Sequence, residues 1–132
     1  MADGHLSYAH NCYGRDLYIV RSDEPLIPGT QELTLEFHYD GGGIGKGADI
    51  RLAADGRITG KGRVGQTTAY YFSFDETLNI GVDRGTPVTD DYLPVDNAFT
   101  GTIHTVRIDL HDDGHDQNLT AADRQRVALA HQ

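Results

Sequence analysis

Carboxylates are the side chains whose type and spacing most clearly suggest chemistry in this sequence. They crowd one segment, in which Gly81 and Gly85 separate them, and they are Asp75, Glu76, Asp83, Asp90 and Asp91. Calcium takes about six to eight oxygen ligands, and an acidic loop can supply them. The segment therefore predicts a calcium site on Asp75, Asp83, Asp90 and Asp91, with Tyr92 as a neighbouring ligand contact. It has no EF-hand pattern, so a solvated acidic loop is the alternative.

A pair of these loop carboxylates could also serve as the acid and the base of a glycosidase-like reaction. That chemistry depends on the separation of the two groups, which a sequence does not show, and the chain has no Trp to stack on a sugar ring. We therefore assign no catalytic residue, and a small hydrolase-like enzyme stays an alternative. A second acidic cluster, which we expect to form only a polar link to the tail, comprises Asp109, Asp112, Asp113 and Asp116.

The glycine-rich segment 40–47 (DGGGIGKG) invites comparison with phosphate-binding loops, which use backbone N–H groups and one lysine. Asp40 stands where such loops have their first glycine, and Gly47 stands where a Ser or Thr would hold magnesium. The segment also joins two expected strands rather than a strand and a helix. We expect a hairpin connection, on which Asp40 and Lys46 are candidate ligand contacts.

Cys12 is the only cysteine, so it forms no internal disulfide and builds no zinc site by itself. On a strand, His10 would share a face with Cys12 and could act as its base in nucleophilic catalysis. We favour a half-buried structural thiol, because no oxyanion-hole signature accompanies the pair. The histidines are scattered, and the turn residues between His111 and His115 argue against a specific zinc site.

These groups must be positioned by strands, which the alternation of residue types predicts. Leu33, Leu35, Phe37 and Tyr39 alternate with polar residues, which predicts a strand with one buried and one wet face. Asp55-Gly56 is a hairpin turn signal between expected strands at 50–53 and 57–64. Further strands are expected at 5–10, 17–21, 70–74 and 98–110, the last with His104, Val106, Ile108 and Leu110 on one face.

The spacing of the turns is typical of a β-sandwich. Only the tail suggests a helix, over about 120–131, where Thr120 and Asp123 form a capping box. We see no internal repeat and no domain boundary. The expected fold is a single all-β domain over 1–132, with its core at about 4–110. It is an antiparallel β-sandwich of jelly-roll or lectin-like type with a short C-terminal helix.

The composition narrows the classes of partner. The chain has 132 residues and a net charge of −9, and no run of basic residues occurs. Nucleic acids and anionic membranes are therefore not expected as partners. The first residues have no signal-peptide pattern, and no stretch has the length of a membrane span. We expect a cytoplasmic protein of a bacterium.

Residues 72–92 (FSFDETLNIGVDRGTPVTDDY) resemble the C-terminal region of large bacterial arylsulfatases. In that family a string DET-x-D-x-G-x-D-x-G-x-P-V-x-x-x-Y leads into a strand similar to residues 99–103 (FTGTI). Residues 18–25 (YIVRSDEP) and 39–48 (YDGGGIGKGA) match in the same order, so the resemblance spans roughly residues 4–110. Asn79 departs from it, because the family has an acidic residue there.

The resemblance implies a β-sandwich accessory region that packs beside a sulfatase catalytic domain. It brings no active site, because the motif that sulfatases mature is C/S-x-P-x-R, whereas residues 12–15 read CYGR. A free-standing accessory domain would expose the surface that covers its neighbour, and exposed apolar patches mark interaction sites. We therefore expect a non-catalytic binding or assembly module that forms a homo-oligomer or binds a protein partner.

Saccharide or sulfated ligands are a further alternative that the resemblance suggests. A sulfated ligand would have to overcome the net charge of −9 through a local cluster of basic side chains. The candidate cluster is Lys46, Arg51, Arg57 and Lys61.

Overall fold

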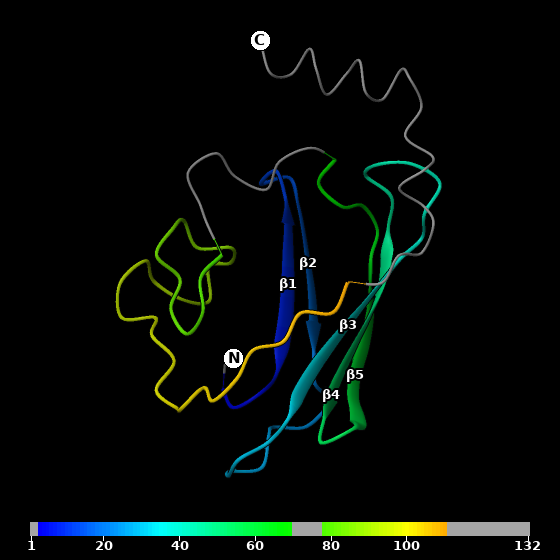
Figure 1. Cartoon of the computed structure of the whole chain (residues 1–132). Helices are drawn as coiled ribbons and strands as arrows, with labels where there is room; N and C mark the ends of the chain where they lie inside the picture. Colours follow the sequence, from blue (N-terminus) through cyan, green and yellow to red (C-terminus); the bar gives the residue numbers. More distant parts are fainter. Residues whose placement is uncertain (1–2, 70–77, 111–132) are drawn as a thin grey trace.

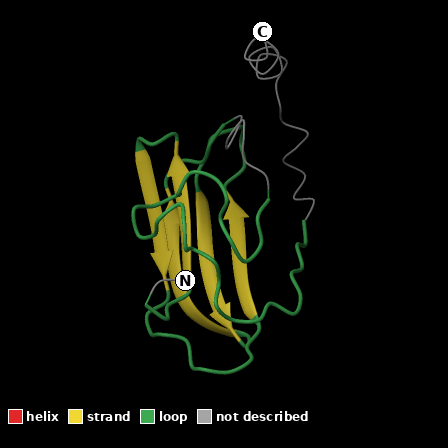
Figure 2. Cartoon of the chain, turned by 90° about the vertical axis from the view of Figure 1, so that its left-hand side faces the viewer, coloured by secondary structure: helices red, strands yellow, loops and turns green. Residues whose placement is uncertain are grey.

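The computed structural model describes residues 3–69 and 78–110, and these residues form two antiparallel sheets. The first sheet pairs β1 (Ser7–Cys12) with β2 (Asp16–Arg21). The second contains β3 (Leu33–Tyr39), β4 (Ala48–Ala54) and β5 (Arg57–Val64) in the order β3-β4-β5. The two sheets lie as two layers (Figure 1), and Figure 2 shows only strands and loops among the described residues. The all-β prediction is confirmed. The expected strand at 70–74 and the tail helix at 120–131 lie outside the described residues.

The turn between β4 and β5 follows the predicted hairpin chemistry. Asp55 and Gly56 are the two loop residues, with φ of 49° and 75°, between the paired residues Ala54 and Arg57. Two positive φ values are the backbone of a type I′ turn, whose twist matches that of the strands it joins. Glycine is favoured at the second position because it has no Cβ to clash there.

The core lies between β4 and β5 on one side and β2 on the other. Alternate residues of β4 are buried, and Val20 and Val64 complete the apolar cluster with Ala48, Ile50 and Leu52. Two glycines of β5 let the layers approach closely. A Cβ on Gly62 would lie 2.4 Å from a methyl group of Val20, and one on Gly60 would lie 2.6 Å from the carbonyl oxygen of Arg21.

β3 has the predicted bounds, but its apolar face is not buried among the described residues. The register places Leu33, Leu35 and Phe37 beside Ala54, Leu52 and Ile50, so their side chains share the core side of the sheet. They nevertheless remain 41%, 48% and 43% exposed. The physical reason is that β2 packs over β5 rather than over β3. From the two-stranded layer, the ring of Tyr8 meets that of Phe37 edge-on, at a centroid separation of 6.2 Å.

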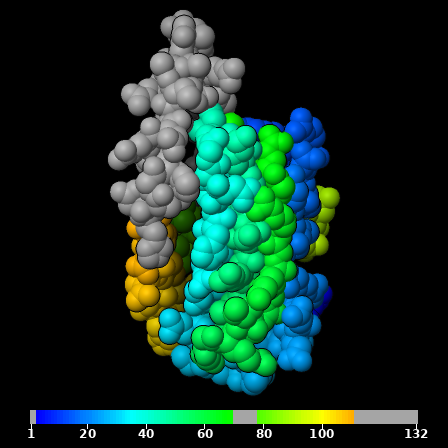
Figure 3. Space-filling view, turned by 90° about the vertical axis from the view of Figure 1, so that its right-hand side faces the viewer, coloured from blue at the N-terminus to red at the C-terminus, as the bar shows by residue number. Residues whose placement is uncertain are grey.

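The strand predicted at 98–110 is not formed. These residues lie alongside β3 (Figures 1 and 3) but belong to no strand of either sheet. A strand requires a hydrogen-bonded neighbour, and to the rest of the described chain the backbone of this segment makes one bond outside the sheets, from the Phe99 N–H to the Gly81 carbonyl at 2.7 Å. The alternation of apolar residues is present, but the ladder that it predicted is absent from the described residues.

Candidate functional site

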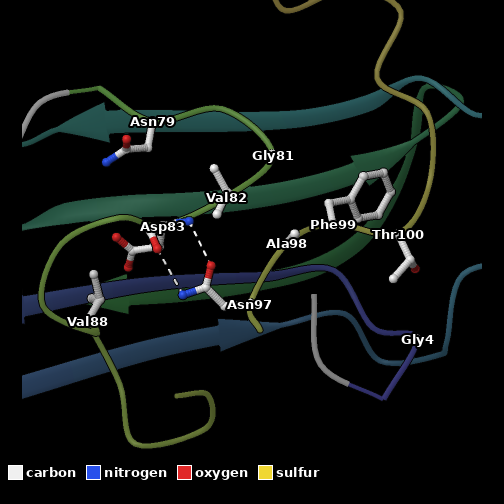
Figure 4. A pocket seen from close by; sticks show the side chains of 10 residues that line it. All are labelled: Gly4, Asn79, Gly81, Val82, Asp83, Val88, Asn97, Ala98, Phe99 and Thr100. Atoms are coloured by element: carbon white, nitrogen blue, oxygen red, sulfur yellow. Dashed lines mark hydrogen bonds between the residues drawn. The ribbon is translucent and has the colours of Figure 1, made fainter. Parts of the chain in front are cut away.

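Residues 78–100, which we call the acidic loop, border an open hollow of about 690 Å³. Figure 4 shows residues from both ends of the loop around it, with Gly4 on the far side. Asp83 and Asn97 lie against one another, as the dashed lines show. The Asp83 N–H donates to Asn97 Oδ1 at 3.0 Å, and Asn97 Nδ2 donates to the Asp83 carbonyl at 2.9 Å. This reciprocal pair joins two parts of the loop that are 14 residues apart.

The carboxylate of Asp83 organises the same loop. Its Oδ1 accepts the Gly85 N–H at 3.0 Å, and its Oδ2 accepts the Tyr92 hydroxyl. The Tyr92 hydroxyl in turn accepts the Val88 N–H at 2.9 Å. Asn11 of β1 donates to the Val88 carbonyl at 3.2 Å, which ties the loop to the first sheet. Asp83 and Tyr92, predicted as ligand contacts, therefore hold the loop's own backbone in place.

The described residues do not assemble the predicted calcium site. Across residues 3–69 and 78–110, no group of three His, Cys, Asp or Glu side chains could hold a metal ion. Asp90 and Asp91 are exposed, whereas Asp83 is half-buried in the loop network. Asp75 and Glu76 lie outside the described residues, so the calcium site in its full predicted form stays a prediction.

The glycine-rich segment forms the expected connection between β3 and β4, and Asp40 fastens it to β5. Arg63 Nη1 donates to Asp40 Oδ1 at 2.6 Å, and Arg63 Nη2 donates to Asp40 Oδ2. Arg63 also bonds Asp49 of β4 at 3.1 Å. The hydrogen bonds from Arg63 hold the pKa of Asp40 below its ordinary value, because they stabilise the carboxylate. Asp40 is thus an anchor of the loop.

Inside the loop, the Tyr39 hydroxyl bonds backbone groups on two sides. It donates to the Gly43 carbonyl at 2.5 Å and accepts the Lys46 N–H at 2.9 Å. The Lys46 carbonyl accepts both the N–H and the hydroxyl of Thr67, at 2.9 and 2.8 Å. The backbone of Lys46 therefore closes the loop, although Lys46 is an exposed residue.

Cys12 and His10 share the inward face of β1, as the strand geometry predicted. Cys12 is fully buried and His10 almost so. The His10 ring lies beside that of Tyr18, at a centroid separation of 6.4 Å. Burial lowers the pKa of His10, because it disfavours the charged imidazolium. A thiol with no exposed surface offers no route for a substrate, so the arrangement favours the structural interpretation of Cys12.

The four basic residues proposed for a sulfated ligand do not form one cluster. Arg51 and Lys61 are register partners on the wet face of β4 and β5. Arg57 begins β5 at one end of the sheet, whereas Lys46 precedes β4 at the other end. Arg51 also pairs with Glu36 at 3.6 Å. The sheet therefore separates the charges that a sulfate would need together.

Sequence reasoning missed the apolar surface along β3. We call Leu33, Leu35 and Phe37 the β3 strip; all three side chains lie on the core side, yet each is more than a third exposed. Within residues 3–69 and 78–110, β3 is one of the two edge strands of its sheet, so the strip borders an edge of backbone N–H and C=O groups. The sequence carried no signal for this exposure, because the strands expected at 70–74 and 98–110 would have widened the layer that covers the sheet.

Comparison of the chain with protein-family models, with curated proteins and with solved structures found no match. Within the described residues, no helix is long and apolar enough to cross a membrane.

Proposed function

We propose that the chain is a non-catalytic β-sandwich module that binds a protein partner by docking an extended segment along β3. The observation that carries this proposal is the β3 strip, an exposed apolar row at the edge of a sheet. In strand addition, backbone hydrogen bonds supply affinity, and side chains at alternate positions supply specificity. β3 offers both features on one strand.

Charge favours a partner that is different from the chain itself. Glu36 is the middle residue of β3. An antiparallel two-fold pair of β3 strands centred there would place two Glu36 carboxylates opposite each other, and such like-charge pairs are destabilising. The net charge of −9 also makes two copies repel. The fitting partner is an extended segment with apolar residues on one face and Lys or Arg on the other.

The jelly-roll or lectin-like form of the sandwich and its relation to the arylsulfatase accessory region belong to this proposal. Support comes from the two facing sheets and from the residues expected to do chemistry. In the described part of the chain, the Asp40 carboxylate accepts from Arg63, and its N–H donates to the Gly47 carbonyl. The Asp83 carboxylate accepts the Gly85 N–H, and Cys12 is buried. These contacts suit a binding module better than a hydrolase.

The test measures, by calorimetry, how tightly the whole chain binds a synthetic peptide of alternating Val and Lys residues. Leu35→Ser should weaken binding by about threefold to tenfold, because Leu35 is 48% exposed before docking and only that part of the ~1.5–3 kcal/mol for a fully buried Leu side chain is gained on binding. Thr34→Ser, on the opposite face of β3, is the matched control and should leave the affinity unchanged. Equal affinity in the wild type and in Leu35→Ser would exclude β3 as the docking strand.

A further inference from the structure

Residues 102–110, which we call the strap, run beside β3 in the same direction as that strand (Figures 1 and 3). Every residue of the strap is exposed, including Val106, Ile108 and Leu110. The strap contacts no strand closely enough to join either sheet of the described residues. Two exposed apolar rows, one on β3 and one on the strap, therefore lie next to each other in one chain.

The residue pattern of the strap complements that of β3. If Arg107 lies beside Glu36, the period-2 alternation places Val106 and Ile108 on the same side as Leu35 and Phe37. The charged side chains then meet on the wet face, and the apolar side chains meet on the core side. This is the partner chemistry that the charge of β3 favours: an extended segment with alternating apolar residues and a cation on its other face.

The ion pairs in the structure show what must rearrange. Arg107 now donates to Asp109 at 2.9 Å, while Glu36 lies 3.6 Å from Arg51 and 3.2 Å from His38. All these side chains are at least partly exposed, so exchanging one ion pair for another changes the free energy little. The apolar rows of the strap and β3 would then decide the balance, because closure removes both from water.

We propose that the strap closes on β3 as an additional strand and thereby blocks the docking of a partner. Closure is a property of the chain alone, whereas the blocking role rests on the proposed function. In the open position, the β3 strip is accessible to a partner. In the closed position, Val106 and Ile108 cover Leu35 and Phe37, and a partner segment must displace the strap before it can bind.

Closure is tested first with a tryptophan reporter, because the chain contains no Trp. Ile108→Trp should be quenched by acrylamide at least twofold less than Ile27→Trp, which replaces an exposed residue between β2 and β3. Arg107→Glu, added to Ile108→Trp, should restore the stronger quenching. In the wild-type chain, the strap amides should exchange hydrogen more slowly than amides of an unpaired exposed segment. In Arg107→Glu, their exchange should be faster than in the wild type. Equal quenching at both positions, with unprotected strap amides, would overturn closure.

Blocking is tested by binding of the Val–Lys peptide to the whole chain. Arg107→Glu should bind the peptide at least threefold more tightly than the wild type, because it releases the strap. Arg84→Glu makes the same charge change on the exposed acidic loop and should show a smaller gain. Arg107→Lys should resemble the wild type.

The two sets of measurements separate the two proposals. If the reporter in Ile108→Trp is shielded and the peptide binds none of the variants, closure stands, and the blocking role and the proposed function are both wrong. If that reporter is fully quenched and Arg107→Glu gains no more than Arg84→Glu, the strap proposal is wrong, and peptide binding that depends on Leu35 still supports the proposed function.

Discussion

Gly62 shows how a single residue sets the spacing of the two layers. Its missing Cβ leaves room for Val20, whose methyl carbons would lie 2.4 and 3.0 Å from a Cβ at that position. Gly62→Ala should therefore destabilise the fold by about 1–3 kcal/mol, as overpacking of a core does. Urea unfolding followed by circular dichroism measures the change.

Two variants control the Gly62 experiment. Val20→Ala, combined with Gly62→Ala, removes the obstructing methyl groups and should make the cost of Gly62→Ala smaller than it is in the wild-type background. Lys61→Ala, at the exposed neighbouring position of β5, should change the free energy of unfolding by no more than about 0.5 kcal/mol. If Gly62→Ala costs the same in the wild-type background and in the Val20→Ala background, the close approach is not the cause.

Asp40 predicts how the fold responds to acid. Because Arg63 lowers the pKa of Asp40 below its ordinary value of 3.8, the unfolded chain takes up this proton at a higher pH than the folded chain. The stabilisation from the ion pair is therefore fully present above the ordinary value and is lost as the pH falls through the lowered one. Urea midpoints measured across this range should fall less steeply in Asp40→Asn than in Asp23→Asn, which changes an exposed carboxylate after β2. Parallel pH profiles would contradict the assignment.

At the scale of elements, local patterns predicted β3, β4 and the β4–β5 turn, and failed on the strand at 98–110 and on what covers β3. The alternation in residues 33–39 and the Asp55-Gly56 turn depend on neighbours in sequence, and both are confirmed. Burial of Leu35 depends on whether a second layer reaches β3, and pairing of 98–110 depends on a distant partner strand. Periodicity shows which residues share a face; it does not show whether anything packs on that face.

The acidic loop illustrates the same limit at the candidate site. The sequence places Asp83 and Tyr92 in one segment, but it does not reveal that the carboxylate and the hydroxyl bond each other and close the loop. Asn97 carries no signal in the sequence, although its side chain bonds the backbone of Asp83 in both directions. Such pairs arise from the path of the loop backbone, which propensity and spacing do not determine.

Tyr92→Phe tests whether this network holds the acidic loop. The change removes the hydroxyl that donates to Asp83 and accepts the Val88 N–H, so it should cost about 1–3 kcal/mol of local stability. Hydrogen exchange should speed up at the Val88 and Gly85 amides. Leu93→Ala, an exposed residue of the same loop, should leave these amides unchanged. Unaltered exchange in Tyr92→Phe would show that the loop is held by other contacts.

For the whole molecule, the proposed binding would combine two attractions, one from the apolar side of β3 and one from the acidic charge. The exposed β3 strip supplies an apolar attraction, and the net charge of −9 supplies a longer-range attraction to cations. The two differ in their response to salt, because ions screen charges over about 10 Å at 0.1 M and about 3 Å at 1 M, whereas apolar contact is not screened. Salt therefore separates their contributions to binding.

The affinity for the Val–Lys peptide should fall severalfold when the salt concentration is raised from about 0.1 M to about 1 M. At the higher concentration the screening length is about 3 Å, which is the distance between two groups in direct contact. Glu36→Gln should reduce the dependence on salt, since it removes the central carboxylate of β3. A Val–Thr peptide, which keeps the apolar face without the cations, should bind with little dependence on salt. An affinity for the Val–Lys peptide that is unaffected by salt would mean that the acidic charge plays no part in selecting the partner, and that the apolar strip alone does so.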